Sequence, residues 1–366
     1  MLFQTPVAAF LEALAPVARV VEARNTIPIL SHVRLIARQG ELWLTASDLD
    51  REAEARLELD VEAEGETTAP AAKLVEIARS LPKSATLRFH SDDSHGVAAV
   101  SSGRARFTLA TLPASDFPAI GDAPFPCAFS WPAQKLAEDW ACVSHAIRTE
   151  ETRYYLNGIH LCAPEGRIVV VATDGHRLAR IKTDIEVAEM PPIIVPTATV
   201  KEIIRRAAAL GKEEQVAFQA GPNRLRIRSG DTSLTSKLID GTFPDYERVI
   251  PRDFRAWCEA SSEAVSTALA RVRIAATAQS ARVKFDFGDR LKLEVAGAET
   301  SASDEIEAEA EGGEMTIGFN SRYAAEAVQA LDGVRVKFSL TDPGSPAVLA
   351  TPARPNRIVV LMPLRV

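Results

Sequence analysis

The sequence repeats itself at an interval of 126 residues, and this repetition limits the fold more strongly than any other feature of the chain. The segment APAAKLVEIARSLP, which starts at Ala69, returns as VPTATVKEIIRRAA, which starts at Val195. The same interval relates two further pairs of dipeptides, Ser47-Asp48 with Thr173-Asp174 and Phe117-Pro118 with Phe243-Pro244. Three landmarks at one interval indicate a duplicated structural unit.

A third and more diverged copy follows the first two. The segment Ile317–Leu331 has the same order of a short apolar run and a helical pattern, and its Asn320 stands 124 residues after Pro196. Three domains are therefore predicted, at residues 1–126, 127–250 and 251–366. Proline-rich stretches mark both boundaries, and a prior of about 150 residues per domain gives two or three domains for 366 residues.

Each copy has the pattern of two helices and roughly eight short strands. The helices are predicted from apolar residues at helical spacing, over Leu2–Arg24, Ala71–Leu81, Pro132–Arg148, Thr197–Leu210, Ser261–Thr277 and Asn320–Leu331. Alternating runs such as RLRIRS and RVKFSL predict strands. The fold class is therefore α+β, with one module repeated three times.

The segment Ile168–Thr183 contains the strongest local signal, because Asp174-Gly175 stands between two strand-like runs. An Asp-Gly pair favours a tight hairpin turn in which both central residues have positive φ. Asp174 and His176 would share one face of a strand, so an acid-base or metal pair is one interpretation. A turn aspartate beside a strand-edge histidine is better supported, because no third ligand or nucleophile stands nearby.

Signatures of catalysis and of membrane insertion are missing from the sequence. It has no phosphate-binding loop, dinucleotide fingerprint, nucleophile elbow or zincin motif, so no catalytic residue, metal site or cofactor is predicted. The cysteines Cys127, Cys142, Cys162 and Cys258 form no CxxC pair, which predicts reduced and mostly buried thiols. No apolar run reaches the roughly 18 residues of a membrane helix, and a cytoplasmic protein is predicted.

The formal net charge is −7, yet basic residues gather on all of the predicted helices. Those on the second helix of each copy are Lys73 and Arg79, then Lys201, Arg205, Arg206 and Lys212, and finally Arg322. Ordinary solvated helix faces would explain any one of these positions. Cations repeated on every helix would let one surface follow the phosphates of a nucleic acid without reading its sequence.

Six strings resemble one known family over essentially the full length of the chain and in register. They are RNTIPILSHV from Arg24, TLPASDFP from Thr111, RYYLNG from Arg153, ATDGHRLA from Ala172, SKLIDGTFPDYERVIP from Ser236 and MPLRV from Met362. Together they are similar to the bacterial DNA polymerase III beta subunit, the sliding clamp family. The threefold repeat agrees with the three-domain subunit of that family.

The resemblance implies a non-catalytic ring. Two chains would associate head to tail as a homodimer, and six domains would close around double-stranded DNA without sequence preference. The implied partners are the DNA polymerase III alpha subunit, the clamp loader, and other polymerases or repair proteins that carry short linear motifs, with no cofactor and no membrane. An alternative is a non-replicative paralogue that acts as a peptide-binding hub and never loads on DNA.

The resemblance also implies three sets of functional residues. The groove for partner peptides would use Leu156, Thr173, Gly175, His176, Arg177, Leu178, Pro244, Arg248, Val249, Asn320, Tyr323, Val360, Met362, Pro363, Leu364 and Arg365. DNA binding would use Arg24, Arg79, Arg153, Tyr154 and Tyr155, and the dimer interface would join Phe107 to Ile274 of the other subunit. Ser280, Gly344 and Pro346 depart from the pattern of the family at the rim of the groove.

Overall fold

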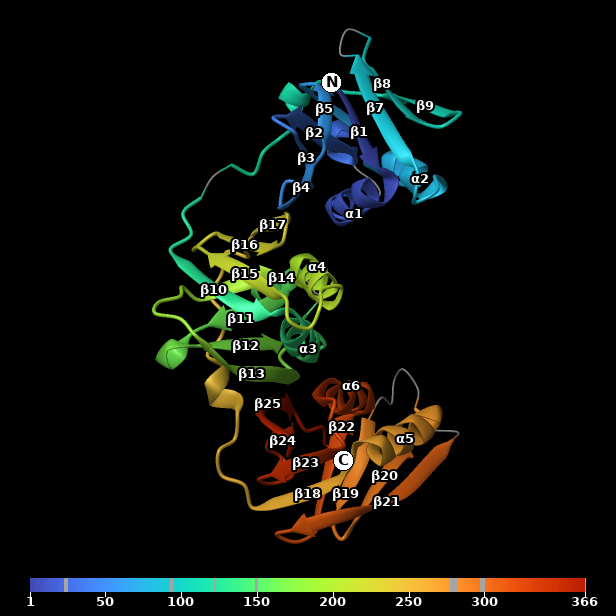
Figure 1. Ribbon diagram of the computed structural model, residues 1–366. Helices are drawn as coiled ribbons and strands as arrows, with labels where there is room; N and C mark the ends of the chain where they lie inside the picture. Colours follow the sequence, from blue (N-terminus) through green and yellow to red (C-terminus); the bar gives the residue numbers. More distant parts are fainter. Residues whose placement is uncertain are drawn as a thin grey trace. The chain divides into compact units, whose positions relative to one another are not determined.

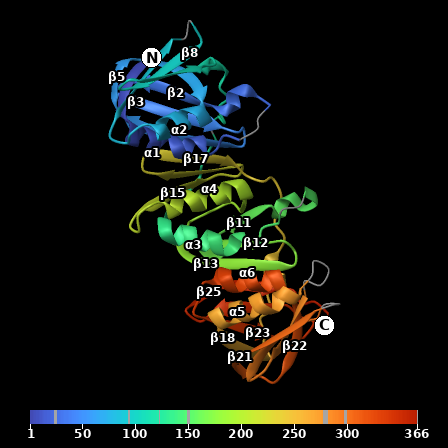
Figure 2. The same cartoon turned by 90° about the vertical axis from the view of Figure 1, so that its right-hand side faces the viewer.

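The computed structural model describes residues 1–22, 26–92, 95–121, 123–148, 151–276, 282–296 and 300–365 (Figures 1 and 2). Within these residues the chain forms two compact units. The first unit comprises Met1–Pro132 and Gly211–Lys237, and the second comprises Ala133–Leu210 and Leu238–Val366. The division runs through the middle repeat, so each unit combines strands from two repeats.

Each repeat has the predicted α+β composition of two helices and about eight strands, which confirms the predicted fold class. A strand and a helix are followed by further strands, a second helix and three final strands, and this order recurs in all three repeats. The helices are α1 (Val7–Ala18), α2 (Ala71–Ser80), α3 (Ala133–Ser144), α4 (Thr197–Ala208), α5 (Ser262–Val272) and α6 (Ser321–Leu331).

Two antiparallel sheets form the first unit. The five-stranded sheet has the order β5-β1-β7-β8-β9, and the eight-stranded sheet has the order β10-β15-β16-β17-β4-β3-β2-β6. Their strands are β1 (Leu2–Pro6), β2 (His32–Arg38), β3 (Glu41–Ser47), β4 (Arg51–Glu58), β5 (Asp60–Ala63), β6 (Gly65–Pro70), β7 (Thr86–Asp92), β8 (Val97–Ser102), β9 (Ala105–Ala110), β10 (Cys127–Pro132), β15 (Gln215–Ala220), β16 (Arg224–Ser229) and β17 (Thr232–Lys237).

A twelve-stranded sheet forms the second unit, and its order is β14-β11-β12-β13-β25-β24-β23-β18-β21-β20-β19-β22. Its strands are β11 (Gly158–Cys162), β12 (Arg167–Thr173), β13 (Arg177–Glu186), β14 (Ile193–Pro196), β18 (Ala256–Ser261), β19 (Arg282–Phe287), β20 (Arg290–Ala296), β21 (Ser301–Glu311), β22 (Met315–Asn320), β23 (Arg335–Leu340), β24 (Ala347–Thr351) and β25 (Arg354–Leu361). Within this unit α3 packs on α4, and α5 packs on α6 (Figure 1).

The last strand of one repeat pairs with the fourth strand of the repeat before it, at both junctions within the chain. In the first unit β17 runs antiparallel to β4, and Ser236 lies opposite Arg51. In the second unit β25 runs antiparallel to β13, and Leu361 lies opposite Arg177 (Figure 1). Each junction is therefore a continuous β-ladder, whose backbone hydrogen bonds hold one repeat to the next.

Proline ends the strand that precedes four of the helices, and Pro132 is the one before α3. Pro6, Pro70 and Pro196 stand directly before α1, α2 and α4 with φ of −59°, −57° and −60°. Proline fixes this φ and has no N–H to leave unpaired, so it suits the start of a helix. In the third repeat Ser261 and Asn320 take the same place, and their side chains accept hydrogen bonds from N–H groups of the first turn.

The prediction of one helix over Leu2–Arg24 was wrong at its start. Leu2–Pro6 form the strand β1, which pairs with both β5 and β7. Phe3 and Thr5 are buried while Gln4 and Pro6 are exposed, and this period of two belongs to a strand rather than a helix. The other five helices begin within one residue of their predicted starts.

The apolar run of β12 is buried on both faces of the sheet. Only Arg167 at its first position is exposed. Helix α3 packs against one face, while Val169 and Val171 join a cluster with Phe243 and Ile358. A strand covered on both sides needs apolar residues at successive positions, which explains why IVVVA precedes the hairpin turn.

Candidate functional site

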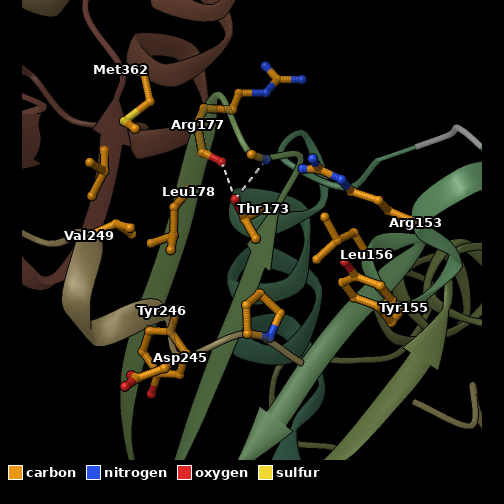
Figure 3. Close-up of a pocket in the computed structure, with 13 residues that line it drawn as sticks. Arg153, Tyr155, Leu156, Thr173, Arg177, Leu178, Asp245, Tyr246, Val249 and Met362 are labelled. Carbon is orange, nitrogen blue, oxygen red and sulfur yellow. Dashed lines mark hydrogen bonds between the residues drawn. The ribbon is translucent and has the colours of Figure 1, made fainter. Parts of the chain in front are cut away.

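An apolar cavity of about 230 Å³ lies in the second unit, next to the turn between β12 and β13 (Figure 3). We call it the groove, and it is lined by Arg153, Tyr155, Leu156, Thr173, Gly175, Arg177, Leu178, Pro244, Asp245, Tyr246, Val249, Val360 and Met362. The lining comes from the middle and third repeats, which meet at the β13–β25 ladder. The segment Tyr246–Val249 contributes as a short 3₁₀ helix.

The floor of the groove is buried, while part of its rim is exposed. Leu156, Leu178 and Val360 are each no more than 3% exposed. By contrast, Met362 is 39% and Val249 is 41% exposed, and Figure 3 shows them beside Leu178. A preformed apolar hollow with an exposed apolar rim can bury the apolar side chains of a binding partner.

Side chains of the hairpin turn fix one wall of the groove. The Thr173 hydroxyl donates to the carbonyl of Arg177 at 2.7 Å and accepts from the N–H of Gly175 at 3.1 Å (Figure 3). Asp174 Oδ1 accepts from the N–H groups of His176 and Arg177 at 2.8 and 3.0 Å. The predicted turn with two positive φ angles was wrong, since only Gly175 has one, at 89°. The side chains of Thr173 and Asp174 hold the turn instead.

The first repeat contains the same turn. Ser47 Oγ accepts from the N–H of Leu49, and Asp48 Oδ1 accepts from the N–H groups of Asp50 and Arg51. The ion pair from Arg51 to Asp48 corresponds to the ion pair from Arg177 to Asp174. Since the aspartate has this structural role twice, the acid-base interpretation of Asp174 and His176 loses its support.

Arg177 connects the groove to α6. It is 7% exposed, and its Nε donates to Asp174 Oδ2 at 3.1 Å while its Nη1 donates to Glu326. Its guanidinium carbon lies 4.3 Å from the centre of the Tyr323 ring. A buried guanidinium needs such partners, because an unpaired buried charge is costly.

A second, polar cavity of about 450 Å³ adjoins the groove and shares Arg177 with it. We call it the polar cavity, and it is lined by Ser144, His145, Ile147, Arg148, Asp174, His176, Arg177, Thr197, Lys201, Arg322, Tyr323 and Glu326. The rings of His176 and Tyr323 stack with centroids 6.4 Å apart. Two residues predicted for the groove, His176 and Tyr323, therefore line the polar cavity.

An uncharged cluster at the groove consists of His160, Cys162 and Tyr246. The ring of His160 stacks on Phe243 at 4.5 Å, and burial lowers the pKa of His160 to about 4. Burial likewise raises the pKa of the Tyr246 hydroxyl, which lies 3.7 Å from the Cys162 sulfur, and it raises the pKa of the Cys162 thiol. His160, Cys162 and Tyr246 are therefore uncharged at neutral pH.

The structure brings most of the predicted groove residues together. Nine of them line the groove: Leu156, Thr173, Gly175, Arg177, Leu178, Pro244, Val249, Val360 and Met362. Of the remainder, Arg248 pairs with Asp245 in solvent and Asn320 caps α6. Leu364 forms a bridge with Gly318, Arg365 accepts a hydrogen bond from Arg282 through its carbonyl, and Pro363 lies between Met362 and Leu364.

The structure also adds groove residues that the sequence analysis missed or assigned elsewhere. Asp245 and Tyr246 line the groove, and their place directly after Pro244 was the signal that could have found them. Arg153 and Tyr155, which were predicted to bind DNA, line the groove as well. Tyr154 is 55% exposed, and Arg79 is exposed at the end of α2. Arg24 and Ser280 lie outside the described residues.

The predicted basic face of α4 requires correction. Arg206 is buried and its Nε donates to Glu202 at 3.0 Å, so it belongs to the interior. Lys212 follows the helix, which ends at Ala208. Lys201 and Arg205 remain exposed on α4, and Arg205 pairs with Glu202.

The two residues predicted for the dimer interface lie at surfaces of different units. Phe107 is half-buried on β9, which is the edge strand of the five-stranded sheet. Ile274 is 84% exposed in the short helix Arg273–Ala275.

Across the described part of the chain, no helix is long and apolar enough to cross a membrane. The same residues contain no cluster of three metal-ligating side chains.

Comparisons with known proteins give one consistent result. Family models of the DNA polymerase III beta subunit match residues 1–121 as its N-terminal domain, 131–245 as its central domain and 247–365 as its C-terminal domain. The beta sliding clamp of Caulobacter vibrioides is 38% identical over 369 residues, which cover 98% of each chain.

Solved structures agree over the whole chain. The DNA polymerase III subunit beta of Pseudomonas aeruginosa superimposes with a TM-score of 0.95 at 34% identity and covers 100% of both chains. The sliding clamp of Bartonella birtlesii bound to griselimycin superimposes with a TM-score of 0.94 at 35% identity, again over 100% of both chains. The chain therefore belongs to the family of the bacterial DNA polymerase III beta subunit, the DNA sliding clamps, which are processivity factors and not catalysts.

Proposed function

We propose that two copies of this chain close head to tail into a ring around double-stranded DNA and present the groove to replication and repair proteins. The partners would be the DNA polymerase III alpha subunit, the clamp loader and other polymerases or repair proteins. We place the three domains at residues 1–126, 127–250 and 251–366, and the ranges matched by the three family models support these boundaries. A tether on chromosomal DNA would work in the cytoplasm of a bacterium.

The groove is the observation that carries this proposal. A short partner segment with leucine and phenylalanine side chains would bury them over Leu178 and Val360, between Val249 and Met362. The groove is built at the β13–β25 ladder, so its shape depends on the junction of two repeats. A peptide would therefore find a largely preformed site, which lowers the entropy lost on binding.

The repeat supplies a geometry for the dimer. Each internal junction pairs the last strand of one repeat with the fourth strand of another. The last strand of the first repeat is β9, whose outer edge has no strand beside it among the described residues. The fourth strand of the third repeat is β21, which pairs with β18 only through Ala308–Glu311, so its first half has an open edge within the described chain. These two edges would pair between subunits.

The register and the charges support the same interface. Ala110 stands 126 residues before Ser236, which lies opposite Arg51. Ser301 follows the hairpin before β21 as Glu52 follows the equivalent hairpin before β4, so Thr300 corresponds to Arg51. Ala110 would then lie opposite Thr300, and Arg106 opposite Asp304. Arg106 lies on β9 and Arg104 directly precedes it, whereas Asp304, Glu305 and Glu307 lie on β21. Opposite charges on the two edges would favour this pairing over self-pairing of either edge.

DNA would be held without sequence preference. Exposed cations on the helices, such as Arg79, would contact phosphates, with Tyr154 available to stack on an exposed base. The other residues predicted to bind DNA are Arg24, Arg153 and Tyr155. A hub that never loads on DNA is the less favoured alternative, because the likeness to sliding clamps spans all three domains.

Fluorescence anisotropy with a labelled peptide that contains glutamine, leucine and phenylalanine tests the groove. Combining Val249→Ala with Met362→Ala should raise the Kd at least about tenfold, since two exposed apolar contacts are lost. Phe254→Ala is the matched control, because Phe254 is 43% exposed but does not line the groove. An unchanged Kd in the double variant would reject the groove as the peptide site.

A further inference from the structure

The polar cavity is a surface feature that the proposed groove does not explain. It lies where the end of α3, the start of α4 and the start of α6 meet the hairpin turn. Its volume of about 450 Å³ exceeds the 230 Å³ of the groove. Its lining is polar and charged, so it suits a ligand of different chemistry from the apolar groove.

The two cavities adjoin at Arg177 of the hairpin. Arg177 lines both of them, and His176 lies on the polar side. The carbonyl of His176 accepts from the N–H of Met362 at 3.0 Å, and Met362 lines the groove. An extended peptide advances about 3.3 Å per residue, so residues next to the apolar anchors can reach the polar cavity.

The polar cavity carries positive charge that its own acidic residues do not neutralise. Its charged lining contains four cations (Arg148, Arg177, Lys201 and Arg322) and two carboxylates (Asp174 and Glu326). Both carboxylates bind Arg177. Burial lowers the pKa of His145 to about 4, so this histidine adds no charge at neutral pH.

Lys201 and Arg322 are the cations most available to a ligand. Lys201 is the fifth residue of α4, is exposed, and makes no ion pair with any described residue. Arg322 is 60% exposed, and its Nε lies 3.9 Å from Glu326, at the outer limit of an ion pair. Its guanidinium carbon lies 5.2 Å from the centre of the Tyr323 ring, which holds the charge beside the cavity.

We propose that the polar cavity binds an aspartate or glutamate side chain of the partner segment whose apolar residues fill the groove. This proposal rests on the proposed function of the groove. A carboxylate would accept hydrogen bonds from Lys201 and Arg322, which can donate and cannot accept. The shared residue Arg177 and the hydrogen bond between His176 and Met362 place the polar cavity beside the groove, which favours a peptide carboxylate over a DNA phosphate as the ligand. The polar cavity therefore gives partner proteins with acidic flanks an advantage over proteins with neutral flanks.

The test uses two labelled peptides with the same apolar core of glutamine, leucine and phenylalanine. Three residues on each side of the core are glutamate in one peptide and glutamine in the other. The wild-type protein should bind the acidic peptide about fivefold more tightly at low salt, as expected for one or two partly exposed ion pairs. The ratio of the Kd for the glutamine peptide to the Kd for the glutamate peptide should fall to about one when Lys201→Gln is combined with Arg322→Gln. Lys212→Gln removes one exposed charge outside the cavity and should keep the preference.

Each of the other outcomes contradicts either the carboxylate site alone or the groove as well. Equal binding of the two peptides by the wild-type protein overturns the carboxylate site but leaves the groove intact. A preference that survives in the double variant also overturns it. Weakened DNA retention in the double variant with an unchanged peptide preference assigns the cavity to phosphates instead. Failure of both peptides to bind rejects the groove, and the carboxylate site with it.

Discussion

Arg177 and Arg357 occupy symmetric positions in the ladder between β13 and β25. The ladder is centred on the pair of Ala179 and Val359, and each arginine stands two residues before that centre on its own strand. Each side chain reaches a carboxylate on a helix of the other repeat. Arg177 binds Glu326 on α6, and Arg357 Nη2 donates to Asp139 Oδ1 on α3 at 2.7 Å. Two reciprocal ion pairs therefore hold the junction on which the groove is built, and the pair of Arg357 with Asp139 is buried on both sides.

The ion pair of Arg357 with Asp139 should be costly to break from one side. Arg357 is 5% and Asp139 is 1% exposed in its side chain, so Arg357→Met leaves a buried carboxylate without its cation. We expect a loss of about 3 kcal/mol in the stability of the β13–β25 junction. Hydrogen exchange of the β13 and α3 amides measures this loss directly.

Two further variants control this prediction. Arg354→Met removes a neighbouring arginine that is 38% exposed and pairs with Glu138, so it should cost less than about 1 kcal/mol. Combining Arg357→Met with Asp139→Leu should recover most of the lost protection, because both buried charges are then removed. Equal losses for Arg354→Met and Arg357→Met would contradict the buried ion pair as the fastening element.

The predictable part of this fold follows from its repetition. Prolines before α2 and α4 and the Phe-Pro pairs recur at one interval, so the number of modules and most helix starts could be derived from residue patterns. The strand β1 could not, because Phe3 and Thr5 belong to an alternation of only five residues that merges with the helical pattern after Pro6. Pairing of β25 with β13 joins residues far apart in the chain, which no local pattern contains.

The second unit should lose stability when the pH falls below about 6.5. The pKa of buried His160 is lowered to about 4, whereas an unfolded histidine titrates near 6.5. Above pH 6.5 neither state binds the proton, and between 6.5 and 4 only the unfolded state does. The contribution of His160 is therefore complete above pH 6.5 and falls by about 2 kcal/mol at pH 5.

His160→Phe isolates this effect, because a phenyl ring can keep the stack on Phe243 without a titrating nitrogen. Urea unfolding at pH 7 and pH 5 should show a smaller loss for this variant than for the wild-type protein. His90→Gln, at an exposed position on β7, should keep the full loss. If the stability of wild type and of His160→Phe depends on pH in the same way, His160 is not the cause of the loss.

The proposed dimer predicts that two distant substitutions have the same effect. Phe107→Asp on β9 and Ile274→Asp beside α5 should each convert the dimer to a monomer, because both place a charge in the interface. Analytical ultracentrifugation reports the mass. Val334→Asp is the matched control, since Val334 is 87% exposed in the same repeat as Ile274 but lies outside the proposed interface. A dimer that survives both substitutions would rule out this pairing of edges.

The residues of the candidate site could also be predicted only in part from the sequence. The family motifs located the residues of the groove wall, but they did not separate residues that share a motif. Tyr154 and Tyr155 are adjacent in RYYLNG, yet Tyr155 lines the groove while Tyr154 is exposed. Arg205 and Arg206 are also adjacent, and burial of the Arg206 pair with Glu202 removes one cation from the surface. Orientation on an irregular segment or a helix depends on the packing of neighbouring elements.

Retention on circular DNA tests the proposed ring most directly. The protein is loaded on a nicked plasmid by a clamp loader with ATP, separated from free protein by gel filtration, and then treated with a restriction enzyme that cuts the plasmid once. A closed ring predicts that the protein stays with the circular DNA and leaves after linearisation, because it can slide off an end. Equal retention on circular and linear DNA would contradict encirclement.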